Sequence, residues 1–559
     1  MQPQPRARPD RTRRIIVFVT FESEAAPVGG LGAVMSLLPR RVARVEPECF
    51  TIAPFFRTIT AHRKPELFKA IRTTGHRFEV RFQNRPQPVE IFEYVDQHGF
   101  KTCFLDSPDF FNAPDNPFLN PAAPDQLLAD ALFFCSAVPQ ALVELGKTED
   151  IVVCLQDWET ACVALTISEN PAIRFAAAVL VLHNAYDKPL PEPILSAMGW
   201  RKARGSTVLR RTIPSLTGPL CTVSENFARE LTHEPLLARV YTPHLQALFK
   251  KKGIVGINNG LFEPLDFPGG AIEAARAGDF LPILEEKQTR RTALVREMQQ
   301  DWAEQPWGQL DWTDFNGPIF MMFGRDDPRQ KGYDLAAAAI REIPEGLAKF
   351  IFTPIPGDEG LAGLGFLKRL AEERAGEVLV FPFRMSRGYK ALQQGSSYLV
   401  LSSFYEPFGG ATEGYSVGTP VLARATGGLV QQVVPHPSVS LPGAVSRLVS
   451  TFHPKKSLPS GLLFREPDMP LSEVVAGWRT INECAYWPDG DRIADRVGTP
   501  LYDGMVQAAT RAFLDAIKVY TDDPVDYARM IFGGFELLKR FSWDASVAGY
   551  RRVFDQVCD

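Results

Sequence analysis

The sequence lacks the features that mark membrane-spanning, disulfide-linked and polyanion-binding proteins. It has no run approaching the roughly 18 consecutive apolar residues that a membrane span requires. Its eight cysteines are scattered and include no Cys-x-x-Cys pair, which favours reduced thiols in a cytoplasmic protein over disulfides or a zinc site. With 61 basic and 65 acidic residues, the net charge is −4. We therefore expect neither a membrane nor a nucleic acid as a partner.

What is present is the composition of an ordinary soluble globular protein, with 45% hydrophobic and 23% charged residues. A chain of 559 residues is too long for one hydrophobic core and suggests about two to four domains. Residues 1–13 are rich in arginine and proline and contain no apolar stretch. We interpret them as a disordered basic tail rather than a secretory signal.

Two blocks of the chain alternate short apolar runs with helical stretches. In the first block we expect strands at residues 14–21, 49–56, 151–156 and 177–183. In the second block we expect strands at residues 318–325, 349–356, 378–384, 397–403 and 420–426. Strands that alternate with helices pair in parallel, so each block predicts a doubly wound α/β sheet. Two Rossmann-like domains of this kind, facing each other, would form a deep cleft.

The blocks are separated by a Gly/Pro-containing stretch at 251–270 and a polar helical segment at 271–304. This pattern predicts an N-terminal domain at 14–255 and a C-terminal domain at 256–535. Residues 536–559 carry apolar side chains at three- and four-residue spacing, which is typical of an amphipathic helix. We expect this helix to cross back onto the N-terminal domain.

In the first domain, glycines and polar residues follow the predicted strands. Gly29 and Gly30 lie in a loop that opens a helix, where backbone N–H groups can bind an anion, although many such loops are only tight turns. His183 and Asp157 stand at the carboxyl ends of two further strands. A hydrogen-bonded core histidine and a helix N-cap are the alternatives for these two residues.

In the second domain, two cations and two carboxylates stand at the same kind of edge. Arg325 ends a strand and Lys331 precedes the next helix, so the pair could neutralise a diphosphate without a metal ion, or lie in a solvated loop. Glu406 and Glu413 flank a glycine loop, which fits acid–base chemistry, although acids at helix starts are also favoured by the helix dipole. Free N–H groups before a helix are expected at Thr426, Gly427 and Gly428. Together these features predict a nucleotide-sugar site.

The order of these motifs resembles that of the bacterial glycogen and plant starch synthases and, more distantly, of the fungal and animal glycogen synthases. These are retaining glucosyltransferases of GT-B fold. The glycine-loop, Asp-Trp and His-Asn motifs correspond to FESEAAPVGGLGAV, LQDWETA and VLHNAY. The later motifs correspond to GINNGLFEP, FGRDDPRQKGYD and YEPFGGATEGYSVGTPVLARATGG. The resemblance covers nearly the whole chain.

The resemblance implies transfer of glucose, with retention, from ADP-glucose or UDP-glucose to the 4-hydroxyl of an α-glucan end, such as glycogen or a maltooligosaccharide. It implies no metal and no other cofactor. In that reaction His183 would contact the donor glucose, Arg325 and Lys331 would hold the diphosphate, and Glu406 would lie beside the reacting glucose. Glu413 belongs to the same catalytic set.

The resemblance also implies a set of binding residues around donor and acceptor. Backbone N–H groups facing the phosphates are implied at Gly410, Ala411 and Thr412. Residues lining the cleft are implied at Asp157, Asn259, Thr426, Gly427 and Gly428. A homo-oligomer is one option that the sequence leaves open.

Two departures from the family pattern support an alternative without activity, and a further alternative is open in any case. Pro27 stands where the family has a lysine, and Ala33 stands where it has an aspartate. One alternative is therefore a catalytically degenerate GT-B scaffold that binds glucan or nucleotide. The other is a glucosyltransferase with a different acceptor.

Overall fold

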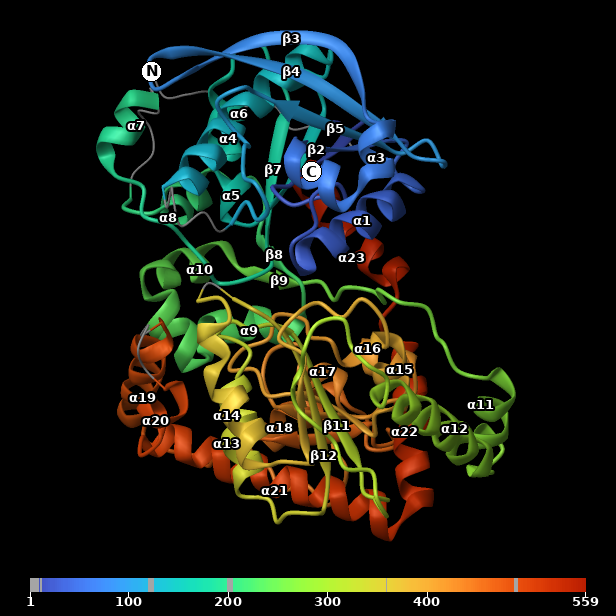
Figure 1. Cartoon of the computed structure of the whole chain (residues 1–559). Coiled ribbons are helices and arrows are strands. Elements are labelled where there is room, and N and C mark those ends of the chain that lie inside the picture. Colours follow the sequence, from blue (N-terminus) through green and yellow to red (C-terminus); the bar gives the residue numbers. More distant parts are fainter. Residues whose placement is uncertain are drawn as a thin grey trace. The chain divides into compact units, whose positions relative to one another are not determined.

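The computed structural model describes residues 10, 13–118, 125–198, 205–357, 359–486 and 491–558. The chain forms two compact units (Figure 1). The first unit contains Met1–Phe262 and Trp543–Asp559, and the second contains Glu263–Ser542. Most of the predicted tail at 1–13 lies outside the described residues.

The unit boundaries lie seven residues beyond the expected positions at 255 and 535. The reason is the packing of Trp543, which belongs to the first unit. Its indole Nε1 donates to Leu261 O at 2.7 Å, and its ring meets the Phe262 ring edge-on at 5.7 Å. Gly260 permits this approach, because a Cβ there would lie 2.5 Å from the Trp543 ring.

The first unit is built on a nine-stranded sheet with the order β3-β4-β5-β2-β1-β6-β7-β8-β9. Its strands are β1 (Ile15–Val19), β2 (Glu48–Pro54), β3 (Arg72–Phe82), β4 (Arg85–Val95), β5 (Lys101–Asp106), β6 (Ile151–Gln156), β7 (Ala176–Leu182), β8 (Leu220–Thr222) and β9 (Ile254–Gly256). The central strands β1 and β6 are buried along their whole length. They read as continuous apolar runs because helices cover both faces of a parallel sheet.

The helices of the first unit follow the strands along the chain. They are α1 (Gly30–Ala43), α2 (Arg57–Arg63), α3 (Pro65–Ala70), α4 (Gln126–Glu144), α5 (Trp158–Ala161), α6 (Val163–Glu169), α7 (Glu192–Met198), α8 (Val208–Thr212), α9 (Glu225–His233), α10 (Gln246–Lys252) and the C-terminal α23 (Trp543–Cys558). One of them, α4, is long and apolar enough to cross a membrane by length and composition, which the search for apolar runs did not predict. It is mostly buried inside the unit, as the core helix of a globular domain is.

The hairpin β3–β4 was not predicted from the sequence. It makes the sheet mixed, because β4 runs antiparallel to both β3 and β5. The turn between the strands, Gln83-Asn84, has positive φ angles of 47° and 65°, which are those of a tight hairpin turn. Along β3, Phe78, Val80 and Phe82 are buried and alternate with exposed residues. This alternation with a period of two residues is the sequence signal that could have predicted strand β3.

The second unit is built on a seven-stranded sheet with the order β10-β13-β12-β11-β14-β15-β16. Its strands are β10 (Trp307–Gly308), β11 (Ile319–Arg325), β12 (Lys349–Ile355), β13 (Val378–Val380), β14 (Tyr398–Leu401), β15 (Val421–Arg424) and β16 (Gly461–Phe464). All neighbours pair in parallel except β10, which is antiparallel to β13. All nine strands predicted in the two blocks are present, with ends that differ by at most four residues. The largest difference is at β13, which ends at Val380, shortly before Pro382.

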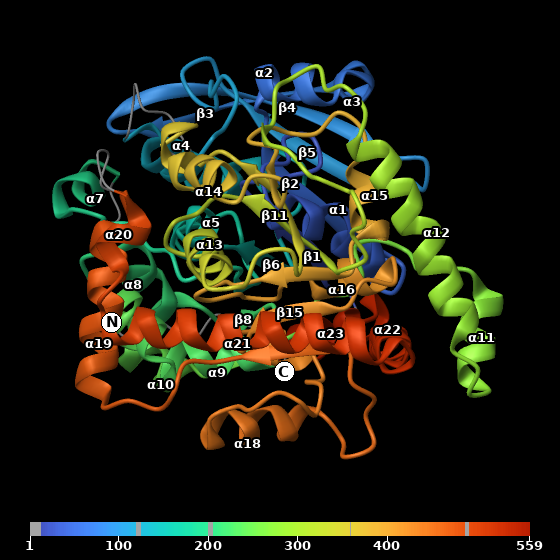
Figure 2. The same ribbon diagram turned by 60° about the horizontal axis from the view of Figure 1, so that its bottom comes forward.

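The helices of the second unit lie between and after its strands along the chain. They are α11 (Gly269–Arg276), α12 (Leu281–Met298), α13 (Tyr333–Arg341), α14 (Gly365–Glu373), α15 (Tyr389–Gly395), α16 (Ala411–Ser416), α17 (Leu429–Gln432), α18 (Gly443–Phe452), α19 (Leu471–Glu483), α20 (Arg492–Arg496), α21 (Pro500–Asp522) and α22 (Pro524–Leu538). Figure 2 shows the long helix α21 in red, with α22 following it. α21 packs on α13 and on the strands β15 and β16.

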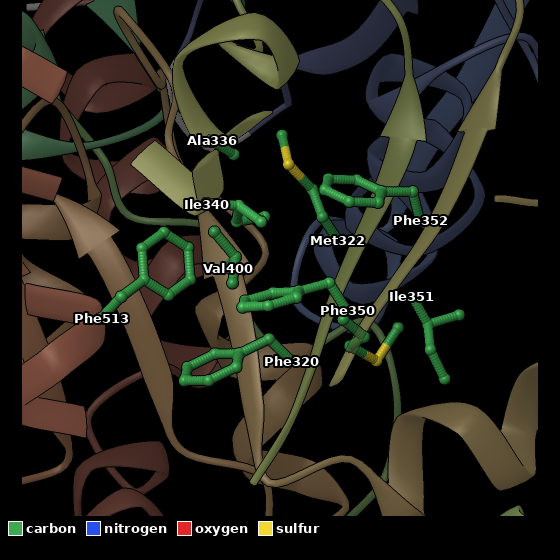
Figure 3. Close-up of a pocket in the computed structure, with 10 residues that line it drawn as sticks. Phe320, Met322, Ala336, Ile340, Phe350, Ile351, Phe352, Val400 and Phe513 are labelled. Atoms are coloured by element: carbon green, nitrogen blue, oxygen red, sulfur yellow. The ribbon is translucent and has the colours of Figure 1, made fainter. Parts of the chain in front are cut away.

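The core of the second unit is aromatic and aliphatic (Figure 3). Phe320 on β11 stacks on Phe350 of β12 at 5.5 Å, and Phe513 of α21 meets Phe320 edge-on at 5.0 Å. The cavity among these side chains has a volume of about 10 Å³, which is at most enough for one water molecule. These strands are therefore held rigidly, and the residues at their ends are placed by that packing.

Candidate active site

His183 lies directly after β7, at the carboxyl edge of the first sheet. Its Nε2 is 2.8 Å from Oε1 of Gln156, the last residue of β6. The Gln156 amide nitrogen donates to Cys154 O at 3.1 Å, which fixes Oε1 as the atom facing the imidazole. The proton is therefore assigned to Nε2, and Nδ1 keeps its lone pair. Burial lowers the pKa of His183 to about 3, so the ring is neutral at physiological pH.

Asp157 holds the backbone of His183 in place. Its Oδ1 accepts from His183 N at 2.6 Å, and its Oδ2 accepts from Asn184 Nδ2 at 3.2 Å. The residue has φ 58° and ψ −177°, a conformation that is rare outside glycine and concentrated at functional sites. It precedes α5, but its side chain makes no capping bond there, so the N-cap alternative is wrong. Asp157 is a positioning residue for His183.

The glycine loop between β1 and α1 folds around the carboxylate of Glu22. Glu22 Oε1 accepts from the N–H groups of Val28 at 2.8 Å, Gly29 at 2.5 Å and Gly32 at 2.9 Å. Gly32 permits this, because a Cβ there would lie 2.7 Å from Glu22 Oε1. The N–H of Gly29 is therefore not available to a ligand, contrary to expectation. Burial raises the pKa of Glu22, although the three N–H groups oppose that shift.

The remaining predicted residues of the first unit are Gly30 and Asn259. Gly30 is the first residue of α1, and a Cβ there would meet no atom within 4 Å. Asn259 is 3% exposed, and its N–H donates to Val223 O at 3.3 Å. Its Oδ1 is buried and has no hydrogen-bond donor within the described part of the chain. A buried acceptor of this kind is ready for a donor from a ligand or a water molecule.

In the second unit, Lys331 and Glu406 form an ion pair at 2.8 Å. Glu406 is 6% exposed, and the same oxygen also accepts from Ser403 Oγ at 2.8 Å. Arg325 ends β11, the strand that pairs with β14 on one side and β12 on the other. The sequence predicted that these residues lie at the carboxyl edge of the second sheet. It predicted neither the Lys331–Glu406 ion pair nor the hydrogen bond from Ser403 to Glu406.

The backbone around Lys331 explains the position of its ammonium group. Gly332 has φ 64°, and a Cβ there would lie 2.4 Å from Ser402 O. Phe404 N donates to Gln330 O at 2.7 Å, and Ser402 Oγ donates to Gly332 O at 2.7 Å. The turn before α13 is thus fastened to the segment after β14, which carries Glu406.

Glu406 is held from its other side by Gly427 and Gly428. Gly428 N donates to Glu406 O at 2.9 Å. This N–H is therefore not free, contrary to the expectation from the sequence. Gly427 has φ 49°, and a Cβ there would lie 1.7 Å from Glu406 O. Thr426, which precedes them, is fully buried. Nearby, the buried pair Arg424–Glu466 anchors the loop, because Arg424 also donates to Phe404 O at 2.7 Å.

Gly410, Ala411 and Thr412 open α16, and Glu413 lies in its first turn. Within the described residues, the N–H groups of Gly410, Ala411 and Thr412 have no protein acceptor, and Thr412 Oγ1 is buried without a partner. Burial raises the pKa of Glu413 to about 7, with Lys331 opposing the shift. The three backbone N–H groups are therefore unsatisfied donors beside the Lys331–Glu406 pair. No group of three His, Cys, Asp or Glu side chains in the described residues could hold a metal ion.

Comparison with known proteins agrees with this geometry. Residues 15–251 match the starch synthase catalytic domain, and residues 296–451 match family 4 glycosyltransferases in conflict systems. The chain is 26% identical over 447 residues to the glycogen synthase of Dechloromonas aromatica (strain RCB), covering 75% of this chain and 84% of that protein. It is 27% identical over 471 residues to glycogen synthase 2 of Nitrosococcus oceani, covering 80% of this chain and 88% of that protein.

Two solved structures share the fold. The catalytic domain of starch synthase IV from Arabidopsis thaliana, bound to ADP and acarbose, superimposes with a TM-score of 0.67 at 17% identity, covering 98% of this chain and 99% of that chain. Sucrose-phosphate synthase from Thermosynechococcus elongatus gives a TM-score of 0.52 at 16% identity, covering 97% of this chain and 99% of that chain. Two Rossmann-like units of this kind are the GT-B fold, as predicted. The family match over residues 15–251 and the two relatives agree with the predicted resemblance to the glycogen and starch synthases and support glycosyl transfer as the activity.

Proposed function

We propose that the protein transfers glucose, with retention, from ADP-glucose or UDP-glucose to the non-reducing end of an α-glucan. The observation that carries the proposal is the Lys331–Glu406 ion pair at 2.8 Å, beside the open N-terminus of α16. A diphosphate leaving group develops negative charge, which Lys331 and Arg325 would neutralise in place of a metal ion. The N–H groups of Gly410 to Thr412 would bind its oxygens.

In the first unit, His183 would bind the donor sugar. Because its Nε2 proton is engaged by Gln156, the neutral Nδ1 would accept a hydrogen bond from a sugar hydroxyl. Asp157 would keep the peptide of His183 in register for that contact. Among the described residues the cysteines form no disulfide and none is exposed, which supports action in the cytoplasm.

The test of this function is release of nucleoside diphosphate from ADP-glucose and from UDP-glucose, side by side, with and without glycogen. Since the related Arabidopsis structure was solved with ADP, we expect release from ADP-glucose to be the faster. Acceptor-dependent release from either donor would support the proposal. No release from either donor by a folded sample would contradict it.

One observation favours a second candidate, a glucan-binding scaffold without activity. The glycine loop is closed on Glu22 and has Pro27 rather than a lysine, so it offers no side-chain cation to a phosphate. A scaffold would bind maltooligosaccharides in calorimetry and release no nucleotide. An enzyme with another acceptor would release nucleotide only when that acceptor replaces glycogen.

A further inference from the structure

A cavity in the second unit lies away from the site described above. Its volume is about 680 Å³, which is in the range of small-molecule sites. It is lined by α12, by the segments 316–317, 346–347 and 395–397, and by the junction of α21 and α22. Those segments enter β11, β12 and β14, whereas Arg325 and Glu406 follow the other ends of β11 and β14. The cavity is therefore at the opposite edge of the sheet.

The cavity lining is positively charged. Within the described residues it contains Lys287 and Arg291 and no aspartate or glutamate, and neither cation forms an ion pair. Arg291 is 8% exposed. Its guanidinium reaches Tyr520 Oη at 3.4 Å and Phe315 O at 3.5 Å, both longer than an ordinary hydrogen bond. The guanidinium also lies over the Phe315 ring, 5.4 Å from its centroid. These contacts leave most of its five N–H donors for another acceptor.

Lys287 adds positive charge to the cavity, but its own hydrogen-bond donors are already occupied by the protein. Its ammonium group donates to Gln394 O at 2.7 Å, Ser396 O at 2.9 Å and Thr419 Oγ1 at 3.1 Å. Three acceptors match the three donors of the charged form. Burial lowers the pKa of Lys287 well below its usual value, so a neighbouring anion would stabilise its charge.

The rest of the lining suits an organic body rather than a bare ion. The ring centroids of Tyr520 and Tyr527 are 5.0 Å apart, and the aliphatic Leu284 and Leu347 add apolar surface. We propose that this cavity binds a small organic oxyanion, a phosphorylated or carboxylated metabolite, whose charged group is held by Arg291. The site is independent of the glucosyl transfer proposed above.

The test is calorimetric titration of the full-length protein with glycerol 1-phosphate, with glycerate and with uncharged glycerol. We expect saturable binding of at least one of the two anions and none of glycerol. The anion that binds more tightly identifies the oxyanion. Lys331→Ala should leave this binding unchanged, which separates it from binding at the carboxyl edge.

Two variants locate the site. Arg291→Gln should weaken anion binding by at least about tenfold, as expected for loss of a charge-assisted pair. Leu284→Trp, which fills the cavity and keeps Arg291, should also weaken it. Arg296→Gln, which removes the same charge from an exposed position of α12, should not. Absence of saturable binding of both anions to the wild type would overturn the proposal. An affinity equal to that of the wild type in Arg291→Gln and in Leu284→Trp would overturn it as well.

Discussion

Single residues set the site through close contacts that few side chains permit. Gly427 lies against the backbone of Glu406, and Gly332 lies against the backbone of Ser402. Both glycines have positive φ angles, so any side chain would add backbone strain to a steric clash. The positions of Lys331 and Glu406 therefore depend on glycines that touch no substrate.

We expect Gly427→Ala to destabilise the second unit by about 2–4 kcal/mol and to weaken ADP binding, because the new Cβ would displace Glu406. Denaturant unfolding and ADP titration would measure the two effects. Gly269→Ala is the matched control, since a Cβ at Gly269 meets no atom within 4 Å. Equal behaviour of the two variants would contradict the role given to Gly427.

Glu413 gives a pH dependence whose sign can be stated. Its pKa is raised by burial from 4.5 to about 7, so the folded state keeps a proton that the unfolded state has lost. This stabilisation is complete below about pH 4.5 and is lost as the pH rises through about 7. Urea unfolding at pH 5 and pH 8 should show a loss in the wild type about 1–3 kcal/mol greater than in Glu413→Gln. An identical loss in both proteins would show that Glu413 titrates normally.

At the scale of elements, the strand ends were predictable and the contacts between loops were not. The apolar runs of β6 and β11 indicate where a strand ends and hence where Asp157 and Arg325 lie. The sequence does not show which carboxylate meets which N–H. Glu22 is such a case, because its partners lie six to ten residues away in a loop whose path depends on the glycines.

We expect Glu22→Ala to open the loop between β1 and α1, because the N–H groups of Val28, Gly29 and Gly32 would lose their acceptor. The loss of stability should be about 2–3 kcal/mol. Hydrogen exchange at Val28, Gly29 and Gly32 would accelerate. Glu24→Ala, which removes a half-buried ion pair with Arg40, serves as control and should leave those amides protected. Unchanged protection in Glu22→Ala would refute the assignment.

At the scale of the whole molecule, the C-terminal helix α23 belongs to the first unit although the second unit precedes it in sequence. It is fixed by Asp555 and Arg551, which pair with Arg14 at 2.7 Å and Glu46 at 3.0 Å. The amphipathic pattern predicts a helix, but its periodicity does not identify the surface that the helix covers. The expectation that it crosses back onto the N-terminal domain comes from the lack of strand signals in this last part of the chain.

We expect Phe554→Ala to destabilise the first unit by about 3–5 kcal/mol, because the ring is fully buried. In calorimetry the transition of the first unit should move to lower temperature while that of the second stays in place. Arg552→Ala, on the exposed side of the same helix, should move neither. A shift confined to the second transition would contradict the division at Trp543.

The central claim is that Lys331, paired with Glu406, supports transfer of glucose from a nucleotide diphosphate to a glucan. The most direct test is transfer of labelled glucose from ADP-glucose and UDP-glucose to glycogen by the wild type, by Lys331→Ala and by a control. The control is Lys368→Ala, which removes an exposed lysine of α14. We predict transfer by the wild type and the control, and a rate lower by about a hundredfold or more in Lys331→Ala with the fold retained. Equal transfer by all three proteins, or no transfer by the folded wild type, would contradict the account.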